Sequence, residues 1–365
     1  MKVLFITNIP SPYRVAFFEE FGKLCDLTVL YEQKVAKDRD PKWKADVVAN
    51  NYKEVYMQRL LQGKDNAFCP KVKKYLDNSK YEIIIVGVYS TLTGMYAINY
   101  MKRKKIPYFI SCDGGIIKKD NLVKYRIKKY FLSGAEGYFS SAKVADEYLQ
   151  YYGAEGNRIY RFSFTSLSTE DIINEPISEE EKRIKRKKLG ITEDRVFLSV
   201  GQFIYRKGYD LLLKISAELP DNVGVYIVGG KPTDELLKLK NRLGLYNVHF
   251  VDFQEKKKLS EYYMMADVFV LPTREDIWGL VINEAMAHAL PIITTDRCVA
   301  GMELVKENGM IIKSDSPSEL LRAMQIYCQK TKEDLMIEET KSLAIIKNYT
   351  FEHMAKQYAN VCKKI

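Results

Sequence analysis

Two segments of the chain place glycines beside charged side chains in patterns that suit an anionic ligand. The first, GQFIYRKG from Gly201 to Gly208, follows the apolar run VFLSV and precedes the amphipathic run YDLLLKISAEL. Glycine at a strand-to-helix turn lets the backbone approach a ligand, and the N-terminus of the next helix favours an anion. Because Arg206 and Lys207 add positive charge, the segment favours a diphosphate. A turn with exposed basic side chains is the alternative, since neither GKS or GKT nor GxGxxG is present.

The second segment, REDIWGLVINEAMA from Arg274 to Ala287, brings three acids close to a predicted helix start. Gly279 would let a ligand reach the first amides of that helix. Glu284 lies about one turn inside an otherwise apolar helix, where a carboxylate needs a hydrogen-bond partner. Sugar hydroxyls are such partners. A favourable interaction with the helix dipole explains the two acids of the loop adequately, but it explains Glu284 less well.

The elements that must position these segments follow from alternating short apolar runs and longer amphipathic runs, the pattern of βα units and parallel sheets. The predicted strands are Lys2–Thr7, Leu27–Tyr31, Ile83–Val88, Tyr108–Ser111, Gly137–Ser140, Arg158–Phe162, Val196–Val200, Val223–Val228, Val248–Val251, Val268–Leu271 and Ile292–Thr295. The predicted helices are Tyr13–Leu24, Leu92–Lys104, Leu122–Leu132, Tyr209–Leu219, Asp234–Leu243, Leu259–Met265, Leu280–Ala289 and Ser318–Cys328.

The composition changes in the middle of the chain, where we expect a domain boundary. Ser163–Pro176 is polar, and Ser178–Leu189 is charged and helix-prone, with Gly190 placed to end the helix. We predict an α/β protein with a Rossmann-like domain over residues 1–170, a second over 171–348, and a helix within 349–365. Ligands of such sheets bind at the carboxyl ends of the strands, so we expect the two domains to face each other across a cleft.

Length and composition narrow the class of protein. The chain has 365 residues, of which 47% are hydrophobic and 28% charged, which is typical of globular proteins and excludes a mostly disordered chain. It has no apolar run near the ~20 residues of a spanning helix. The start, MKVLFITNIPSP, resembles a first strand more than a signal peptide, so we expect a cytoplasmic protein. Six scattered cysteines and three histidines predict neither disulfides nor a metal site, and no cofactor is expected.

The positive charge is concentrated in the first half of the chain. Residues 1–175 carry a net charge of +8 and the remainder +2. An excess of this kind favours an anionic partner such as a nucleic acid, a phosphorylated acceptor or an anionic membrane surface, whereas a solvated basic face is the simpler interpretation. The candidate membrane contacts are Lys102–Lys105 and Lys118–Lys129. The helix predicted there has one apolar face, formed by Val123, Ile127, Tyr130 and Phe131.

The order of these motifs resembles a known family. A GxxxxxKG segment at Gly201–Gly208, a strand ending in two glycines at Val228–Gly230, and an acid pair at Asp276 and Glu284 that runs into EAMA are together similar to family 4 of the retaining GT-B glycosyltransferases, the group 1 glycosyl transferases. The strongest match covers roughly residues 195–315. The resemblance implies a GT-B fold, in which the last helix, within 349–365, crosses back onto the first domain.

The resemblance also implies a role for each matching residue. Lys207 would contact the donor diphosphate, Asp276 the donor sugar and Glu284 the ribose. The helix start at Gly279, Leu280 and Val281 would hold phosphate oxygens, and the loop from Val251 to Phe253 would lie beside the base. The remaining donor-binding candidates are Gly201, Gln202 and Gly229.

Two positions depart from the family pattern. Gln202 stands where the family usually has arginine, and Arg206 is the candidate to supply the missing charge. Asp113 stands in the region where many members have a histidine near the donor sugar, so it is the fourth catalytic candidate beside Lys207, Arg206 and Asp276. The first loop, NIPSPYR, lacks the glycines common there and is either an acceptor contact through Ser11, Tyr13 and Arg14 or simply a turn.

The residues together with the resemblance predict a metal-independent glycosyltransferase of the hexosyltransferase type, acting in surface polysaccharide or glycoconjugate synthesis. The resemblance implies that the reaction retains the anomeric configuration. The enzyme would move a sugar from a nucleotide-sugar, with UDP favoured over GDP, to a glycan or lipid-linked acceptor, and would be peripheral on the inner membrane face. The alternatives are a GT-B-like sugar-nucleotide epimerase or phosphorylase, and a non-catalytic basic protein that binds nucleic acid. We expect no nucleic-acid partner, because no recognised motif is present and the aromatic residues are not interleaved with the basic ones.

Overall fold

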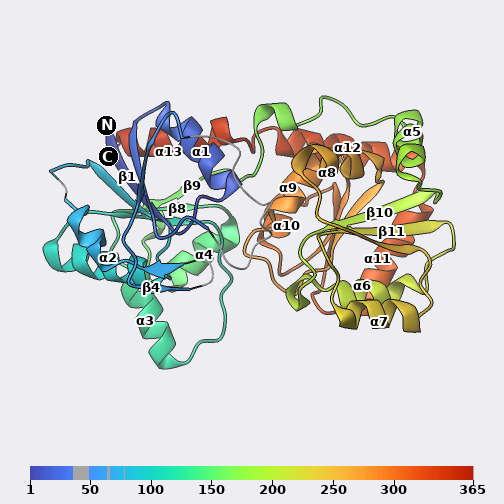
Figure 1. The fold of residues 1–365 in the computed structure, drawn as a ribbon, viewed down its shortest axis with the longest axis horizontal. Coiled ribbons are helices and arrows are strands. Elements are labelled where there is room, and N and C mark those ends of the chain that lie inside the picture. The colour runs from blue at the N-terminus through green and yellow to red at the C-terminus, as the bar shows by residue number, and fades with distance from the viewer. Residues whose placement is uncertain (36–48, 64–65, 78, 365) are drawn as a thin grey trace. The chain divides into compact units, whose positions relative to one another are not determined.

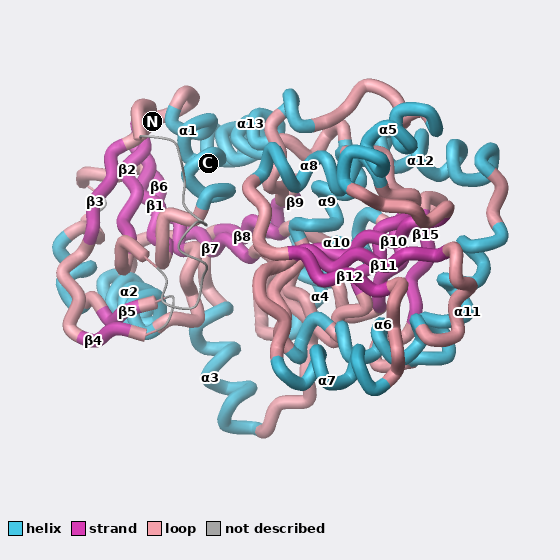
Figure 2. The backbone as a smooth tube through the Cα atoms, turned by 45° about the vertical axis from the view of Figure 1, so that its right-hand side comes forward, coloured by secondary structure: helices cyan, strands magenta, loops and turns pink. Residues whose placement is uncertain are grey.

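The computed structural model describes residues 1–35, 49–63, 66–77 and 79–364. Contacts divide the chain into two compact units (Figure 1). Unit 1 comprises Met1–Ser166 together with Tyr349–Ile365, and unit 2 comprises Leu167–Asn348. Each unit is built around a parallel β-sheet with helices on its faces (Figure 2). The prediction of an α/β protein is therefore confirmed.

The sheet of unit 1 has the strand order β3-β2-β1-β6-β7-β8-β9, and every neighbouring pair is parallel. Strands covered by helices on both faces need apolar side chains on both faces, which is why the inner strands of the sheet are short apolar runs, whereas the edge strands β3 and β9 are partly exposed. The strands are β1 (Lys2–Thr7), β2 (Asp26–Tyr31), β3 (Lys53–Tyr56), β6 (Ile83–Val86), β7 (Phe109–Cys112), β8 (Gly137–Ser140) and β9 (Ile159–Arg161).

The helices of unit 1 begin at residues suited to helix starts. The Thr91 hydroxyl accepts a hydrogen bond from the Gly94 amide, and the Asn121 side chain accepts one from the Lys124 amide. The helices are α1 (Pro12–Gly22), α2 (Leu92–Lys104), α3 (Leu122–Leu132), α4 (Lys143–Tyr151) and α13 (Phe351–Lys364), with single turns at η1 (Pro70–Lys74) and η2 (Gly156–Arg158). A short antiparallel pair, β4 (Leu61–Gln62) and β5 (Ala67–Phe68), lies beside α2.

The C-terminal helix α13 packs against α1 within unit 1. Tyr358 lies fully buried, with its ring stacked on that of Phe139 at a centroid distance of 4.0 Å. The Tyr358 hydroxyl is 2.8 Å from the Ser111 hydroxyl, on β7. The last residues of the chain therefore complete the core that begins with β1.

Unit 2 repeats the arrangement with the strand order β12-β11-β10-β13-β14-β15, again parallel throughout. Its strands are β10 (Arg195–Val200), β11 (Val223–Val228), β12 (Val248–Val251), β13 (Val268–Leu271), β14 (Ile292–Thr295) and β15 (Gly309–Ile312). Its helices are α5 (Glu179–Leu189), α6 (Tyr209–Ser216), α7 (Asp234–Arg242), α8 (Lys256–Met265), α9 (Leu280–Ala287), α10 (Val299–Leu304), α11 (Pro317–Gln329) and α12 (Lys332–Ile346), with turns η3 (Thr169–Asp171) and η4 (Tyr205–Lys207). As expected, Gly190 ends α5 in a left-handed conformation.

The sequence pattern missed several elements, and the apolar face that it predicted on α3 lies exposed. The elements without a prediction are β3, β4, β5, β15, α4, α10 and α12. The apolar face expected on α3 would ordinarily pack inward. Instead Val123 is 68% exposed, Ile127 47% and Tyr130 45%, and only Phe131 of the four is partly covered. Figures 1 and 2 both show α3 extending away from the sheet of unit 1.

Candidate functional site

Gly201, Gly208 and Gly229 allow the backbone after β10 to lie very close to neighbouring backbone. Gly208 has φ of 73°, and a Cβ there would lie 2.1 Å from the Pro272 carbonyl oxygen. A Cβ on Gly229, after β11, would lie 1.8 Å from the carbonyl oxygen of Gly201. The backbone after β10 therefore lies directly against the backbone after β11. The single turn η4, which follows β10, carries Arg206 and Lys207.

One carboxylate binds both basic residues of that turn. The Lys207 ammonium donates to Asp276 Oδ2 at 2.8 Å, and Arg206 Nη1 lies 3.2 Å from Asp276 Oδ1. Lys207 is buried and Arg206 is largely exposed. Burial would raise the pKa of the Asp276 carboxyl, but the charges of Lys207 and Arg206 outweigh it and hold the pKa below its usual value. Because two basic side chains face one carboxylate, the cluster has an excess of one formal positive charge.

The loop that carries Asp276 is fixed by its own backbone. The Asp276 amide donates to the Arg297 carbonyl at 2.9 Å, and its carbonyl accepts from the Val299 amide at 3.2 Å. Gly279 then starts α9 with φ of 101°, and a Cβ there would lie 2.7 Å from the Cys298 sulfur. Asp276 and the N-terminus of α9 are therefore set at the carboxyl end of β13, next to the turn after β10.

Arg274 holds the two loops together, a role that the sequence patterns did not predict. Its guanidinium makes a bidentate pair with the Asp210 carboxylate, at 2.7 and 2.9 Å, and lies over the Tyr205 ring at 3.9 Å. Its amide donates to the Arg206 carbonyl at 2.8 Å. Bidentate pairing restricts both position and orientation. The contact fixes η4, and so the direction of Arg206 and Lys207. The sequence signal would have been an acid two residues after the GxxxxxKG segment together with the arginine that opens the second segment.

Glu284 has a protein partner that the sequence did not reveal. Tyr263 on α8 donates to Glu284 Oε2 at 2.9 Å, and burial together with the Glu284 charge raises the pKa of that tyrosine well above its usual value. The Glu284 carbonyl accepts from His288 Nδ1 at 2.8 Å, while His288 Nε2 is 2.7 Å from the Ser260 hydroxyl. Burial lowers the pKa of His288, although its hydrogen bond to the Glu284 carbonyl opposes the effect. The carboxylate is thus oriented, and half-buried, one turn inside α9.

The other donor-site candidates lie around the same strand ends. Val251 ends β12, and its carbonyl accepts from the Gly229 amide at 3.1 Å. The Gln202 carbonyl accepts from the Ile204 amide at 2.8 Å, which tightens the turn after Gly201. The half-buried members of this group are Gln202, Val251, Phe253, Leu280 and Val281. All of the donor-site candidates therefore belong to unit 2.

The candidates of unit 1 form a second cluster. Arg14, buried on α1, donates through Nη2 to Asp113 Oδ2 at 2.5 Å, just beyond β7. Burial raises the pKa of the Asp113 carboxyl, although the Arg14 charge opposes the rise. Among the residues that the structure describes, Arg14 Nη1 and Asp113 Oδ1 are buried and have no hydrogen-bond partner. Such groups are costly unless something binds them.

These two side chains line a pocket of about 270 Å³ at the carboxyl ends of β1, β6 and β7. Its lining residues are Thr7, Asn8, Tyr13, Arg14, Asn66, Gly87, Val88, Ser90, Thr91 and Asp113. Ser11 does not line it; it is buried at the start of α1, where its carbonyl accepts from the Arg14 amide at 2.9 Å. The structure therefore joins Tyr13, Arg14 and Asp113 in one site and gives Ser11 the place of a helix start.

Solved structures share this fold over the whole chain. HepE of Anabaena in complex with UDP has a TM-score of 0.82 at 16% identity, with all of both chains covered. Sucrose-phosphate synthase of Thermosynechococcus elongatus has a TM-score of 0.76 at 17% identity, with 99% of this chain and 98% of that chain covered. The fold is that of the GT-B glycosyltransferases, as predicted.

Sequence comparison finds a family match within unit 2. Residues 181–342 match the glycosyl transferases group 1, in agreement with the group 1 resemblance of the sequence motifs. An uncharacterized glycosyltransferase of Methanocaldococcus jannaschii is 28% identical over 51% of this chain and 50% of its own length. The lipopolysaccharide glucosyltransferase WaaG of Escherichia coli is 33% identical over 32% of each chain. The chain thus spans half or less of the length of these relatives.

Within the part of the chain that the structure describes, no three His, Cys, Asp or Glu side chains are grouped as metal ligands would be. A search of the same residues for helices found none with the length and apolarity needed to cross a membrane.

Proposed function

We propose that the protein is a glycosyltransferase that moves a sugar from a nucleotide-sugar to a glycan or lipid-linked acceptor. The observation that carries the proposal is the cluster of Lys207, Arg206 and Asp276 beside the N-terminus of α9, in the part of the chain that matches the family. Transfer requires the glycosidic C–O bond to break as the diphosphate leaves. Positive groups placed where charge develops on the leaving oxygens are the main source of rate enhancement for such a step.

Lys207 and the first amides of α9 are the groups suited to that charge. Asp276 holds Lys207 in place before the donor binds, and the diphosphate competes with this carboxylate for the ammonium. In our proposal Asp276 then contacts the donor sugar, as the family resemblance implies. Arg206, which lies on the same carboxylate, supplies the charge that Gln202 lacks.

We propose that the reaction needs no metal, because the two basic side chains and the helix start neutralise the diphosphate where a divalent cation would otherwise do so. Retention of anomeric configuration follows the family resemblance. We further propose UDP as the nucleotide, which the HepE structure in complex with UDP supports. Glu284, oriented by Tyr263, would accept hydrogen bonds from the ribose hydroxyls, and Val251–Phe253 would lie beside the base.

The pocket in unit 1 is our candidate acceptor site. A hydroxyl group can donate to Asp113 Oδ1 and accept from Arg14 Nη1, which satisfies both unpartnered atoms at once. Because Asp113 already balances the charge of Arg14, the pair suits a neutral hydroxyl better than a phosphate. We propose that the acceptor belongs to surface polysaccharide or glycoconjugate synthesis and is met at the cytoplasmic face of a membrane.

A panel of UDP-, GDP- and TDP-sugars, assayed for slow hydrolysis with and without EDTA, tests the proposal. We expect turnover of one or more UDP-sugars that EDTA leaves unchanged, with release of the sugar in the anomeric configuration of the donor by NMR. A thermal-shift assay distinguishes the alternatives: stabilisation by UDP supports a transferase, whereas stabilisation by oligonucleotides alone supports a nucleic-acid-binding protein. Epimerised nucleotide-sugar, or phosphate-dependent release of sugar 1-phosphate, would identify the other two enzyme classes.

A further inference from the structure

Helix α3 turns its apolar stripe outward, which is the reverse of an ordinary surface helix. Leu122 is 75% exposed, and Val123, Ile127 and Tyr130 follow it on one side of the helix. Within α3, all of whose residues are described, only Leu132 is buried. Contiguous apolar side chains left exposed in this way indicate a surface that something else covers.

The polar side of α3 faces the rest of unit 1. Asp120, before the helix start, pairs with Lys124 at 3.2 Å and Lys128 at 2.8 Å. Lys128 also donates to the Tyr152 hydroxyl at 3.1 Å. Tyr130, a member of the apolar stripe, reaches Asn99 on α2 with its hydroxyl, which donates at 2.7 Å. These contacts attach α3 to unit 1 mainly through its polar side. Its apolar stripe therefore faces outward.

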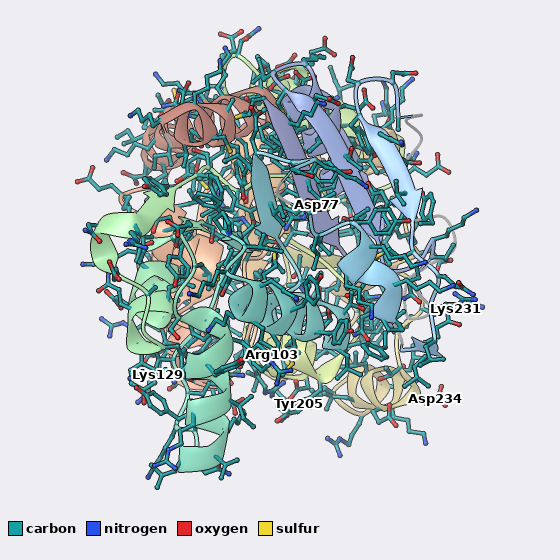
Figure 3. All side chains as sticks on the ribbon, turned by 90° about the vertical axis from the view of Figure 1, so that its left-hand side faces the viewer. Asp77, Arg103, Lys129, Tyr205, Lys231 and Asp234 are labelled. Carbon is teal, nitrogen blue, oxygen red and sulfur yellow. The ribbon has the colours of Figure 1, made fainter. Side chains whose placement is uncertain are left out.

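Basic side chains border the apolar stripe. Lys118, Lys119, Arg126 and Lys129 are exposed on or just before α3. The basic end of α2, from Lys102 to Lys105, lies close by, because the Lys102 ammonium is 4.4 Å from the centre of the Tyr130 ring. Figure 3 shows Arg103 and Lys129 on the same side of unit 1.

We propose that α3 and the end of α2 dock unit 1 onto an anionic lipid bilayer, with Leu122, Val123 and Ile127 inserted between the headgroups. An apolar stripe flanked by basic residues is the arrangement that lies in the plane of a membrane interface. Charge complementarity selects this occupant: exposed carboxylates would repel anionic lipids, and the stripe is bordered by lysine and arginine instead. The docking does not depend on the proposed transfer reaction. Loss of vesicle binding and loss of glycosyltransferase activity can therefore be distinguished.

Flotation of the full chain with vesicles tests the proposal. We expect it to float with equimolar phosphatidylglycerol and phosphatidylcholine, to stay behind with pure phosphatidylcholine, and to lose binding as salt is raised. The variant Leu122→Gln, Val123→Gln, Ile127→Gln should weaken partitioning about 100-fold, from the lost apolar burial. Glutamine keeps helix propensity, so α3 should persist in circular dichroism.

Two further variants separate the contributions. Lys119→Gln with Arg126→Gln should weaken binding about tenfold or more without disturbing the pairs of Asp120. Met336→Gln with Ile337→Gln removes an equally exposed apolar pair from α12 in unit 2, 58% and 56% exposed, and should leave binding unchanged.

Three results would overturn the docking. They are equal binding to both kinds of vesicle, binding that the triple α3 variant retains, and a dimer in sedimentation equilibrium that the same variant abolishes without vesicles. The last would show that a second copy of the chain covers the stripe. A Leu122→Trp variant gives an independent readout, since its fluorescence should shift to the blue on vesicles if the helix inserts.

Discussion

At the scale of single residues, the candidate donor site depends on how one carboxylate and two basic side chains share their charge. Asp276 pairs with Lys207 and Arg206, and Arg274 fixes the turn that carries both. In the proposed function Lys207 acts on the leaving diphosphate, while Arg274 acts through the position of the turn. The two roles predict different kinetic consequences.

Replacing Lys207 by alanine should lower turnover much more than donor affinity, because its charge matters most when the bond is breaking. Loss of an oxyanion-type donor corresponds to roughly 2–4 kcal/mol in activation free energy. Steady-state kinetics with the best UDP-sugar, set beside UDP binding by calorimetry, measure the two effects. Full activity in a Lys207→Ala variant whose circular dichroism is unchanged would remove Lys207 from the mechanism.

Replacing Arg274 by lysine should reduce kcat/KM about tenfold, because lysine cannot reproduce the bidentate contact with Asp210. Global destabilisation could also lower kcat/KM, so thermal unfolding of the variant is measured as a control. We expect Asp210→Asn to give a similar kinetic loss, and the double variant to be no worse than either single variant. Additive losses would contradict a shared role in placing η4.

At the scale of elements, the two ends of α9 are fixed in different ways, the start by the backbone of a glycine and the end by the hydrogen bonds of a histidine. Gly279 and Gly230 share a φ of 101°, but only Gly279 would place a Cβ against a neighbouring side chain, that of Cys298. The other end of α9 is held by His288, whose two ring nitrogens are engaged by Ser260 and by the Glu284 carbonyl.

Gly279→Ala should therefore destabilise the protein by about 2 kcal/mol or more, from backbone strain and the clash with Cys298, and weaken UDP binding. Gly230→Ala has the same φ and open space for its Cβ, so it reports the backbone strain alone. Urea unfolding of both variants separates the two terms. Equal destabilisation would show that the contact with Cys298 contributes nothing.

His288 makes stability depend on pH in a defined direction. Because its pKa is lowered in the folded protein, the unfolded chain binds the proton more tightly, and stability falls as the pH drops below the unfolded value of about 6.5. Thermal midpoints between pH 7.5 and 5.5 should fall more for the wild type than for His288→Gln, which cannot titrate. Parallel curves for the two proteins would rule out this contribution.

At the scale of the whole molecule, unit 1 is closed by residues from both ends of the chain. Tyr358 on α13 packs between Phe17, Phe139 and Phe162, although nearly 200 residues of unit 2 intervene. The stability of unit 1 thus depends on the last helix, while the candidate donor-site residues all lie in unit 2.

Tyr358→Ala should destabilise unit 1 by about 3–5 kcal/mol, the usual range for a large buried aromatic side chain. UDP should still raise the melting temperature of unit 2 in this variant. Tyr246→Ala, at a tyrosine that is 92% exposed, is the control and should change neither unit. Calorimetry resolves the transitions; loss of UDP stabilisation in Tyr358→Ala would show that the two units do not behave independently.

The sequence by itself determined the layout of the fold and most of unit 2. Periodicity located the buried strands, because a strand covered on both faces must be apolar throughout. Glycines and charges at Gly201–Gly208 and Asp276–Glu284 indicated the candidate donor site, because a close backbone turn and an anionic ligand each require particular residue types. Elements with weaker patterns, such as β3, β15 and α12, were not found.

Only the tertiary structure decided which side chains meet. The contacts of Asp276 with Lys207, of Arg274 with Asp210, and of Arg14 with Asp113 join residues that are 69, 64 and 99 positions apart. Likewise, a helical period shows that α3 has an apolar face. Whether that face is buried depends on which side chains the neighbouring elements turn toward α3. Here the polar partners Asp120 and Tyr152 bind Lys124 and Lys128 on the opposite side, and the apolar stripe is left facing outward.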